Sequence, residues 1–75
     1  MYTYKNISGK SGISYYSTST DSIVVRFNDG ATYIYNHIRP GIEQVERMKV
    51  LAATGQGLNS LISREIKKNY YLRVK

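Results

Sequence analysis

The triplet Asn28-Asp29-Gly30 is the feature of the sequence that most constrains the fold, because it separates two runs of β-branched and aromatic residues. The runs span residues 22–28 and 31–36, and both have the composition that strands favour. Such a turn is typical of a β-hairpin, since Gly30 can take a positive φ at no steric cost. The chain is therefore expected to contain at least one antiparallel pair of strands.

The length of this turn decides which side chains share a face of the sheet. A two-residue loop places Ile34 opposite Val25. A three-residue loop places Tyr33 there instead and brings Tyr35 opposite Ile23. We prefer the three-residue loop, because one face then becomes larger and more uniformly apolar. That face consists of Ile23, Val25, Phe27, Tyr33 and Tyr35, and the other, expected to be half exposed, carries Val24, Arg26, Thr32 and Ile34.

Weaker strand signals precede the hairpin. Residues 2–7 are expected to form an edge strand, residues 8–12 a loop rich in Gly and Ser, and residues 13–16 a short strand. Residues 17–21 are polar, which indicates a loose connection into the strand at 22–28.

The second half of the chain changes to helical spacing. Pro40 suits the first turn of a helix, where no backbone N–H is needed. Glu43 and Glu46 follow, and carboxylates near a helix N-terminus suit its dipole. The apolar stripe of this helix is expected to contain Ile42, Val45, Met48 and Leu51 or Ala52.

A second helix is expected at about residues 58–68, after the turn Thr54-Gly55-Gln56-Gly57 ends the first. Residues 70–75 alternate enough to form a final strand, and an ordered tail is the other interpretation. The buried side chains of the second helix are expected to be Leu58, Leu61, Ile62 and Ile66. We therefore predict one α+β domain, residues 1–75, with a small antiparallel sheet of roughly three to five strands followed by two helices packed on one face.

Several classes of function are disfavoured by the composition. The chain has 75 residues, one His and no Cys, which excludes disulfides and a thiolate metal site. His37 follows a strand with no nucleophile singled out beside it, and the five acidic residues are dispersed, so we expect no metal site, no cofactor and no enzyme. We also expect a cytoplasmic protein, because neither a membrane span nor a signal-peptide core is present in the sequence.

Charge and tyrosine content favour binding instead. Eleven Lys and Arg residues face five Asp and Glu residues, and the net charge of +6 favours polyanions. The eight tyrosines could fill a thin sheet or stack on bases. The residues expected to contact nucleic acid are Arg26, Arg39, Arg64, Lys67, Lys68, Tyr70, Tyr71 and Arg73. The other interpretation of the C-terminal cations is a solvated helix end, where positive charge suits the dipole.

The junction of the helices contains two glycines and an asparagine. Gly55 and Gly57 favour a helix–helix turn over a backbone site for anions. Asn59 is expected to cap free N–H groups of the second helix, or to tie the loop to the sheet, rather than to contact a ligand. The residues expected to hold the fold are Gly30, Tyr33, Tyr35, Pro40, Gly55 and Asn59.

Short motifs along residues 11–66 occur in a distinctive order. They are Ser11-Gly12-Ile13, residues 23–27, Gly30, Tyr33-x-Tyr35, Ile38 with Pro40, and the group Gly55, Leu58, Asn59 and Ile62. In this order they resemble the KTSC domain, a small bacterial and phage domain also found at the C-terminus of some lysyl-tRNA synthetases. Leu58 and Gly57 stand where that family has aromatic residues, and Arg39 is an extra residue before Pro40. The resemblance implies no established activity, and its association with a tRNA enzyme favours RNA.

Two functions fit this sequence. The first is a non-enzymatic module that binds RNA or single strands through a basic surface containing Tyr. The second is a protein-interaction module, such as a phage-type host-directed inhibitor or a homodimeric adaptor. Tyrosines interleaved with basic residues on one face would favour the first. An exposed patch remote from lysines, made of Tyr2, Tyr4, Tyr15 and Tyr16, would favour the second.

Overall fold

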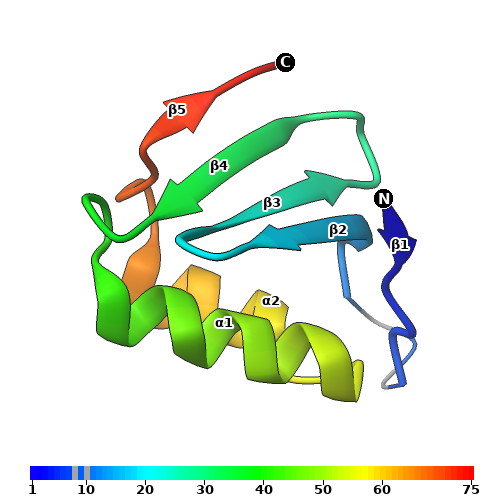
Figure 1. Cartoon of the computed structure of the whole chain (residues 1–75). Helices are drawn as coiled ribbons and strands as arrows, with labels where there is room; N and C mark the ends of the chain where they lie inside the picture. Colours follow the sequence, from blue (N-terminus) through cyan, green and yellow to red (C-terminus); the bar gives the residue numbers. More distant parts are fainter. Residues whose placement is uncertain (8, 10) are drawn as a thin grey trace.

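A five-stranded antiparallel sheet carries two helices on one of its faces (Figure 1). The computed structural model describes residues 1–7, 9 and 11–75. In order across the sheet, the strands are β1 (Tyr2–Thr3), β2 (Ile13–Ser19), β3 (Ser22–Phe27), β4 (Thr32–Asn36) and β5 (Leu72–Arg73). Between β4 and β5 lie α1 (Ile42–Thr54), α2 (Leu58–Leu61) and a π-helical continuation, η1 (Ile62–Ile66). The small α+β fold predicted from the sequence is confirmed.

The β3–β4 hairpin has the register of the three-residue loop. Val25 pairs with Tyr33, Ile23 pairs with Tyr35, and Gly30 takes a φ of 91° in the turn. The predicted apolar face is confirmed, because Ile23, Val25 and Tyr35 are buried in the core and Phe27 and Tyr33 pack against it. On the opposite face Thr32 is buried rather than half exposed. Its backbone is covered by the C-terminal segment, since the Val74 amide donates to the Thr32 carbonyl at 2.8 Å.

The segments before β3 differ from the sequence prediction. Residues 17–19 continue β2, so the tight turn Thr20-Asp21 replaces the expected loose connection. These polar residues can form a strand because their side chains keep contact with solvent at the sheet edge. The first strand is only Tyr2–Thr3, shorter than the expected 2–7. Of the loop expected at 8–12, Ser8 and Lys10 lie outside the described residues.

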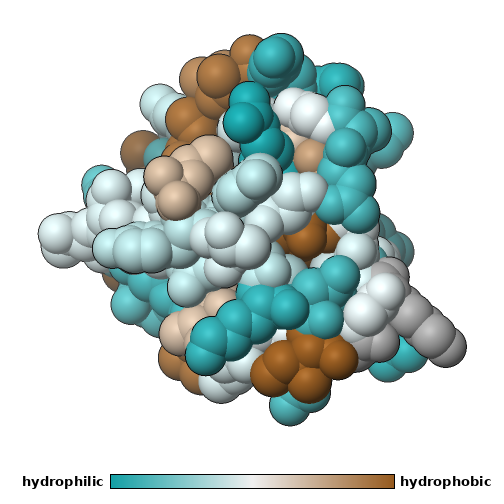
Figure 2. All heavy atoms as spheres, turned by 90° about the vertical axis from the view of Figure 1, so that its right-hand side faces the viewer, coloured by the Kyte–Doolittle hydropathy of each residue, from teal (hydrophilic) through white to brown (hydrophobic). Residues whose placement is uncertain are grey.

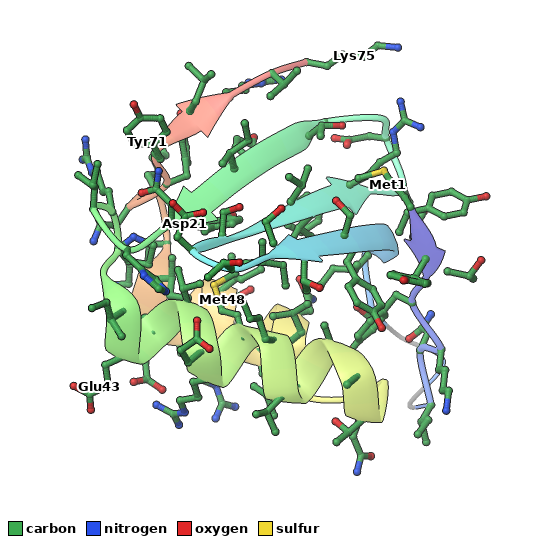
Figure 3. All side chains as sticks on the ribbon, viewed as in Figure 1. Met1, Asp21, Glu43, Met48, Tyr71 and Lys75 are labelled. Carbon is green, nitrogen blue, oxygen red and sulfur yellow. The ribbon has the colours of Figure 1, made fainter. Side chains whose placement is uncertain are left out.

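The first helix starts later than predicted. Pro40 forms a parallel bridge with Asn36, and Gly41 is the N-cap, so α1 begins at Ile42. The delay has a local cause: the Asn36 side-chain oxygen accepts hydrogen bonds from the Ile38 and Arg39 amides and holds a separate turn. Ile42, 61% exposed, is not in the buried stripe. That stripe is Val45, Met48 and Ala52, with Met48 pointing from α1 toward the sheet (Figure 3).

The second helical segment ends before Lys68 and changes geometry along its length. After one turn of α2, the chain continues as the π-helix η1, in which the Lys67 amide donates to the Ile62 carbonyl. The Asn69 amide then donates to the Ile66 carbonyl at 2.9 Å, and this turn ends the helix. The four predicted core residues are confirmed, since Leu58, Leu61, Ile62 and Ile66 are all buried.

The C-terminal segment pairs with the sheet. Tyr33 lies opposite Arg73 and Ile34 lies opposite Leu72, so part of the 70–75 segment is a strand. Within residues 1–7, 9 and 11–75, no helix combines the length and the apolarity that crossing a lipid bilayer requires.

The N-terminal segment crosses the end of α1 and connects it to the sheet. Tyr4 is 3% exposed, and its hydroxyl accepts a hydrogen bond from the Leu58 amide at 3.4 Å. The Ile7 amide donates to the Gly55 carbonyl at 2.8 Å. Gly55 itself ends α1 at a φ of 83°, with its amide bonded to the Leu51 carbonyl. The junction of α1 and α2 therefore depends on residues 4–7.

Two buried tyrosines predict how stability changes with pH. Burial raises the pKa of the Tyr4 and Tyr35 hydroxyls, and the neighbouring Tyr33 and Tyr70 raise that of Tyr35 further. In the unfolded chain both hydroxyls lose their protons near pH ~10. Their contribution to the free energy of unfolding is therefore fully present below that pH and is lost as the pH rises above it.

Urea denaturation across the alkaline range measures this loss. The free energy of unfolding is expected to fall steeply above about pH 10, and the fall should become shallower in the Tyr4→Phe/Tyr35→Phe variant. An equally steep fall in the double variant would show that these two hydroxyls do not titrate as described.

Candidate nucleic-acid interface

Six of the eight predicted contact residues lie along one edge of the molecule. Arg39, Lys67, Lys68, Tyr70, Tyr71 and Arg73 together are called the C-terminal basic surface below. The loop before α1 reaches this edge, since Arg39 Nε donates to Asn69 Oδ1 at 2.6 Å. Figure 3 shows Tyr71 at the start of β5 and Lys75 at the far end of the same segment. Arg73 and Lys75 therefore lie on the segment that forms the β5 edge of the sheet (Figure 3), and Lys67 and Lys68 precede this segment in the chain.

Two aromatic rings and one guanidinium lie together at this surface. The Tyr33 and Tyr70 rings lie 4.7 Å apart between centroids, and the Arg73 guanidinium lies 5.5 Å from the Tyr33 centroid. Arg73 reaches that ring because it lies directly opposite Tyr33 on the neighbouring strand. Such a cation–π contact orients a guanidinium without neutralising its charge. Tyr71, the residue after Tyr70 in the chain, is half exposed.

Lys67 is held in a backbone conformation that favours glycine. Its φ is 54° and its ψ is −119°, the geometry of the first central residue of a type II′ turn. A side chain in this region costs about 1–3 kcal/mol, and such strain often accompanies functional sites. The strained position places a positive charge on the turn that carries Lys68 and Asn69.

Replacing Lys67 with glycine is therefore expected to affect stability and binding in opposite directions. Lys67→Gly should raise the free energy of unfolding by about 1 kcal/mol, because the strain is relieved. The same variant should weaken binding to a polyanion, because one charge is removed. Lys68→Gly is the matched control, since Lys68 has no positive φ and should lose stability as well as charge. Thermal denaturation measures both variants. An equal loss of stability in the two would contradict the claim that the backbone at Lys67 is strained.

Among the described residues, both side-chain carboxylates that form ion pairs lie on helical segments, Glu46 on α1 and Glu65 on η1. Glu46 Oε2 lies 3.0 Å from His37 Nε2 and 2.9 Å from Lys49 Nζ, and Glu65 pairs with Arg47 at 3.3 Å. Hydrogen bonds from His37 and Lys49 lower the pKa of the Glu46 carboxyl below its ordinary value. Among the described residues, no cation of the C-terminal basic surface pairs with an Asp or Glu side chain, although Arg73 Nε donates to the Lys75 main-chain oxygen at 3.2 Å. Its positive charge is therefore available to an outside anion.

The two remaining predicted residues lie elsewhere. Arg64 lines a shallow pocket between α1 and α2 together with Arg47. Arg26 pairs across the sheet with Tyr15 and Thr32, on the face opposite the helices. Its Nε atom is buried and has no hydrogen-bond partner among the residues that the structure describes. The structure does not bring either arginine to the C-terminal basic surface.

The prediction that Asn59 caps the second helix is wrong. Gly57 is the N-cap, and no side chain caps this helix in the described part of the chain. Asn59 lies one residue into α2, too late in the chain for the capping position. The Gly55 amide is already bonded to the Leu51 carbonyl, which supports the helix–helix turn rather than an anion site.

Sequence reasoning missed two residues of this region. The sequence pattern places Tyr33 only among the core residues, yet in the structure it contacts both Tyr70 and Arg73. The alternating pattern of residues 70–75 could have predicted this role of Tyr33, if the segment had been paired with the strand that contains Tyr33-x-Tyr35. Asn69 carries no signal of its own, because its role depends on the distant Arg39. Among the described residues, no three His, Cys, Asp or Glu side chains gather closely enough to hold a metal ion.

Comparison of the chain with protein-family models, with curated proteins and with solved structures gave no match in any of the three.

Proposed function

We propose that this chain is a non-enzymatic module that binds single-stranded nucleic acid, RNA in particular, through the C-terminal basic surface. One observation carries the proposal: the Tyr33 and Tyr70 rings pack together with the Arg73 guanidinium near Tyr33, and Lys67 and Lys68 precede Tyr70 on the same segment of the chain. Proteins that bind single strands combine a positive track for the phosphates with aromatic rings for the bases. We further propose that the chain is a KTSC-type domain that works in the cytoplasm. The support for the family is the order in which its motifs occur within residues 11–66.

The charge distribution supports a phosphate ligand. Lys67 and Lys68 lie on the turn closed by Asn69, Arg73 lies on β5 shortly after it, and all three side chains are exposed. A single strand is flexible enough to follow such a short, bent track, whereas a duplex needs an element that enters a groove. The π-helical end of the second helix and the two-residue strand β5 are too short to serve as that element.

Of the four tyrosines expected to form a protein-contact patch, three cluster through their rings, with centroids 5.7 Å apart for Tyr2 and Tyr16 and 6.5 Å apart for Tyr4 and Tyr16. This cluster is only partly exposed and does not include Tyr15. Tyr4 is buried, and Tyr16 packs against the core. Tyr2 pairs with Tyr16 whereas Tyr15 pairs with Thr3, so Tyr2 and Tyr15 point to opposite faces of the sheet. Figure 2 shows that, on the face seen there, apolar groups are separated by polar and intermediate atoms.

Fluorescence anisotropy with labelled oligonucleotides of roughly 12 nucleotides tests the proposal. Single-stranded RNA and DNA and a duplex should each be titrated at about 50 and 200 mM salt. We expect single strands to bind more tightly than the duplex, with a slope of log K against log salt of roughly −2 to −3. Absence of salt-dependent binding at tens of micromolar protein would refute the proposed function.

Protein interaction is the second candidate function, and one observation favours it. Ile38, on the connection between β4 and α1, is 79% exposed, and Ile42, the first residue of α1, is 61% exposed. Exposed apolar side chains close together are typical of contact surfaces. A pull-down from host lysate with and without nuclease separates the two functions, since partners held through nucleic acid are lost after nuclease treatment.

A further inference from the structure

A shallow pocket opens at the end of the sheet where β3 turns into β4. Its volume is about 440 Å³, and it is lined by Gly12, Phe27, Asn28, Asp29, Ala31 and Tyr33. The volume is within the range of small-molecule sites, ~300–1,000 Å³. Among the described residues, its lining comes from strands and loops alone, without a helical residue. The pocket is therefore an open feature of the sheet rather than a gap within the core.

Two aromatic rings give this pocket its shape. The Phe27 and Tyr33 centroids lie 5.7 Å apart, and their planes meet at 80°. Rings at nearly a right angle form a corner, in which a planar group can stack on one ring and meet the edge of the other. A nucleobase has that planar form, and its stacking on aromatic side chains is a common source of affinity for single strands.

The charged groups near the two rings suit a nucleotide, with cations for its phosphate and a carboxylate for an N–H donor of its base. Arg73 lies over the same Tyr33 ring that lines the pocket, and although its Nε donates to the Lys75 main-chain oxygen at 3.2 Å, its guanidinium keeps a positive charge beside the pocket for a phosphate. Lys75 is close as well, since the Thr32 amide, next to pocket residue Ala31, donates to the Lys75 carbonyl at 3.1 Å. Asp29 contributes a carboxylate to the lining, and one of its oxygens accepts from the Ala31 amide at 3.0 Å. The second oxygen suits an N–H donor on the edge of a base.

We propose that this pocket holds one nucleobase of a bound single strand, stacked in the corner of Phe27 and Tyr33, with its backbone phosphate on Arg73. The base is one that presents an amino group, such as cytosine, whose N4 donates to Asp29. This inference rests on the proposed function, because the strand is held mainly by the C-terminal basic surface. The pocket adds a base contact at one end of the phosphate track.

Phe27 is the only phenylalanine in the chain, so fluorophenylalanine labels the pocket alone. The ¹⁹F signal of the labelled protein should shift on addition of an oligouridine that carries one central cytidine. Inorganic polyphosphate, which offers charge without a base, should leave this signal unchanged. A ¹⁹F signal that does not respond to the base-containing strand, although the strand binds, would overturn the pocket proposal.

A variant that fills the pocket gives an independent measurement. Gly12 has no left-handed φ, and a Cβ there would lie 4.0 Å from Phe27 Cδ1, so Gly12→Leu can extend into the corner. In the wild type, a central cytidine should bind about tenfold more tightly than a central abasic unit. Gly12→Leu should abolish this difference and keep the salt slope. Retention of the tenfold difference would contradict base binding in the pocket.

Two outcomes separate this inference from the proposed function. If the wild-type protein binds neither the cytidine oligonucleotide nor the abasic oligonucleotide in a salt-dependent way, the proposed function itself is wrong. If it binds both oligonucleotides with equal affinity and the expected salt slope, only the pocket proposal is wrong. Asp29→Asn provides a variant with the same volume, and it should remove the preference for cytidine over uridine while the preference over the abasic unit remains.

Discussion

Gly55→Ala is expected to lower the free energy of unfolding by about 2–4 kcal/mol. Gly55 has a φ of 83°, which costs a side chain about 1–2 kcal/mol. An added Cβ would also lie 2.5 Å from the Cβ of Lys5, an atom fixed to the backbone that cannot rotate away. The N-terminal segment would therefore have to move, and the hydrogen bond from the Ile7 amide to the Gly55 carbonyl would weaken. Thermal denaturation should show a Tm lower by roughly 10–30 °C.

Gly30→Ala is the matched control for this substitution. Gly30 has a similar φ of 91°, and a Cβ there meets nothing within 4 Å. Its loss should be limited to the conformational cost of about 1–2 kcal/mol. Lys5→Gly should recover part of the loss in the Gly55→Ala background, because it removes the Cβ that the new methyl group meets. Equal losses for the two alanine variants would contradict the close packing of Lys5 on Gly55.

Lys68→Gln/Arg73→Gln is expected to weaken binding to single-stranded RNA by at least about tenfold at low salt. Each side chain is assigned to a phosphate, so the salt slope should become less negative by roughly 1.4. Arg47→Gln/Arg64→Gln is the matched control, because it also removes two positive charges but acts on the pocket between α1 and α2. Anisotropy titrations at several salt concentrations measure both quantities. Equal weakening by the two double variants would show that net charge, rather than this surface, determines affinity.

The hairpin and the core of the second helix could be predicted because their causes are local. The register depends on the turn at Gly30 and on the alternation around Val25, and both are visible in a short stretch of sequence. The π-helix could not be predicted, because apolar residues at Leu58 and Ile62 fit α and π spacing equally well. Pro40 misled the prediction, since Asn36 forms a local turn that delays the helix.

The sequence predicts which types of residue the candidate site contains, but it predicts less well which of them the fold brings together. The cations and tyrosines of residues 67–73 are adjacent in sequence, so their proximity follows from the chain itself. Arg39 joins them only through Asn69, and Arg26 is separated from them by the face of the sheet on which it lies. The burial of Tyr4 depends on Leu58, which lies 54 residues away. Such contacts depend on the tertiary fold, which the local pattern does not contain.

The central claim is that the C-terminal basic surface binds single-stranded nucleic acid. Backbone amide NMR of the labelled protein, titrated with a short single-stranded RNA, tests it most directly because it reports on each backbone N–H group separately. We expect the largest shifts at Lys67, Lys68, Tyr70, Tyr71 and Arg73, with smaller ones at Tyr33 and Arg39. Shifts centred on Arg47 and Arg64, shifts centred on Tyr15 and Arg26, or no shifts at saturating RNA would contradict the claim.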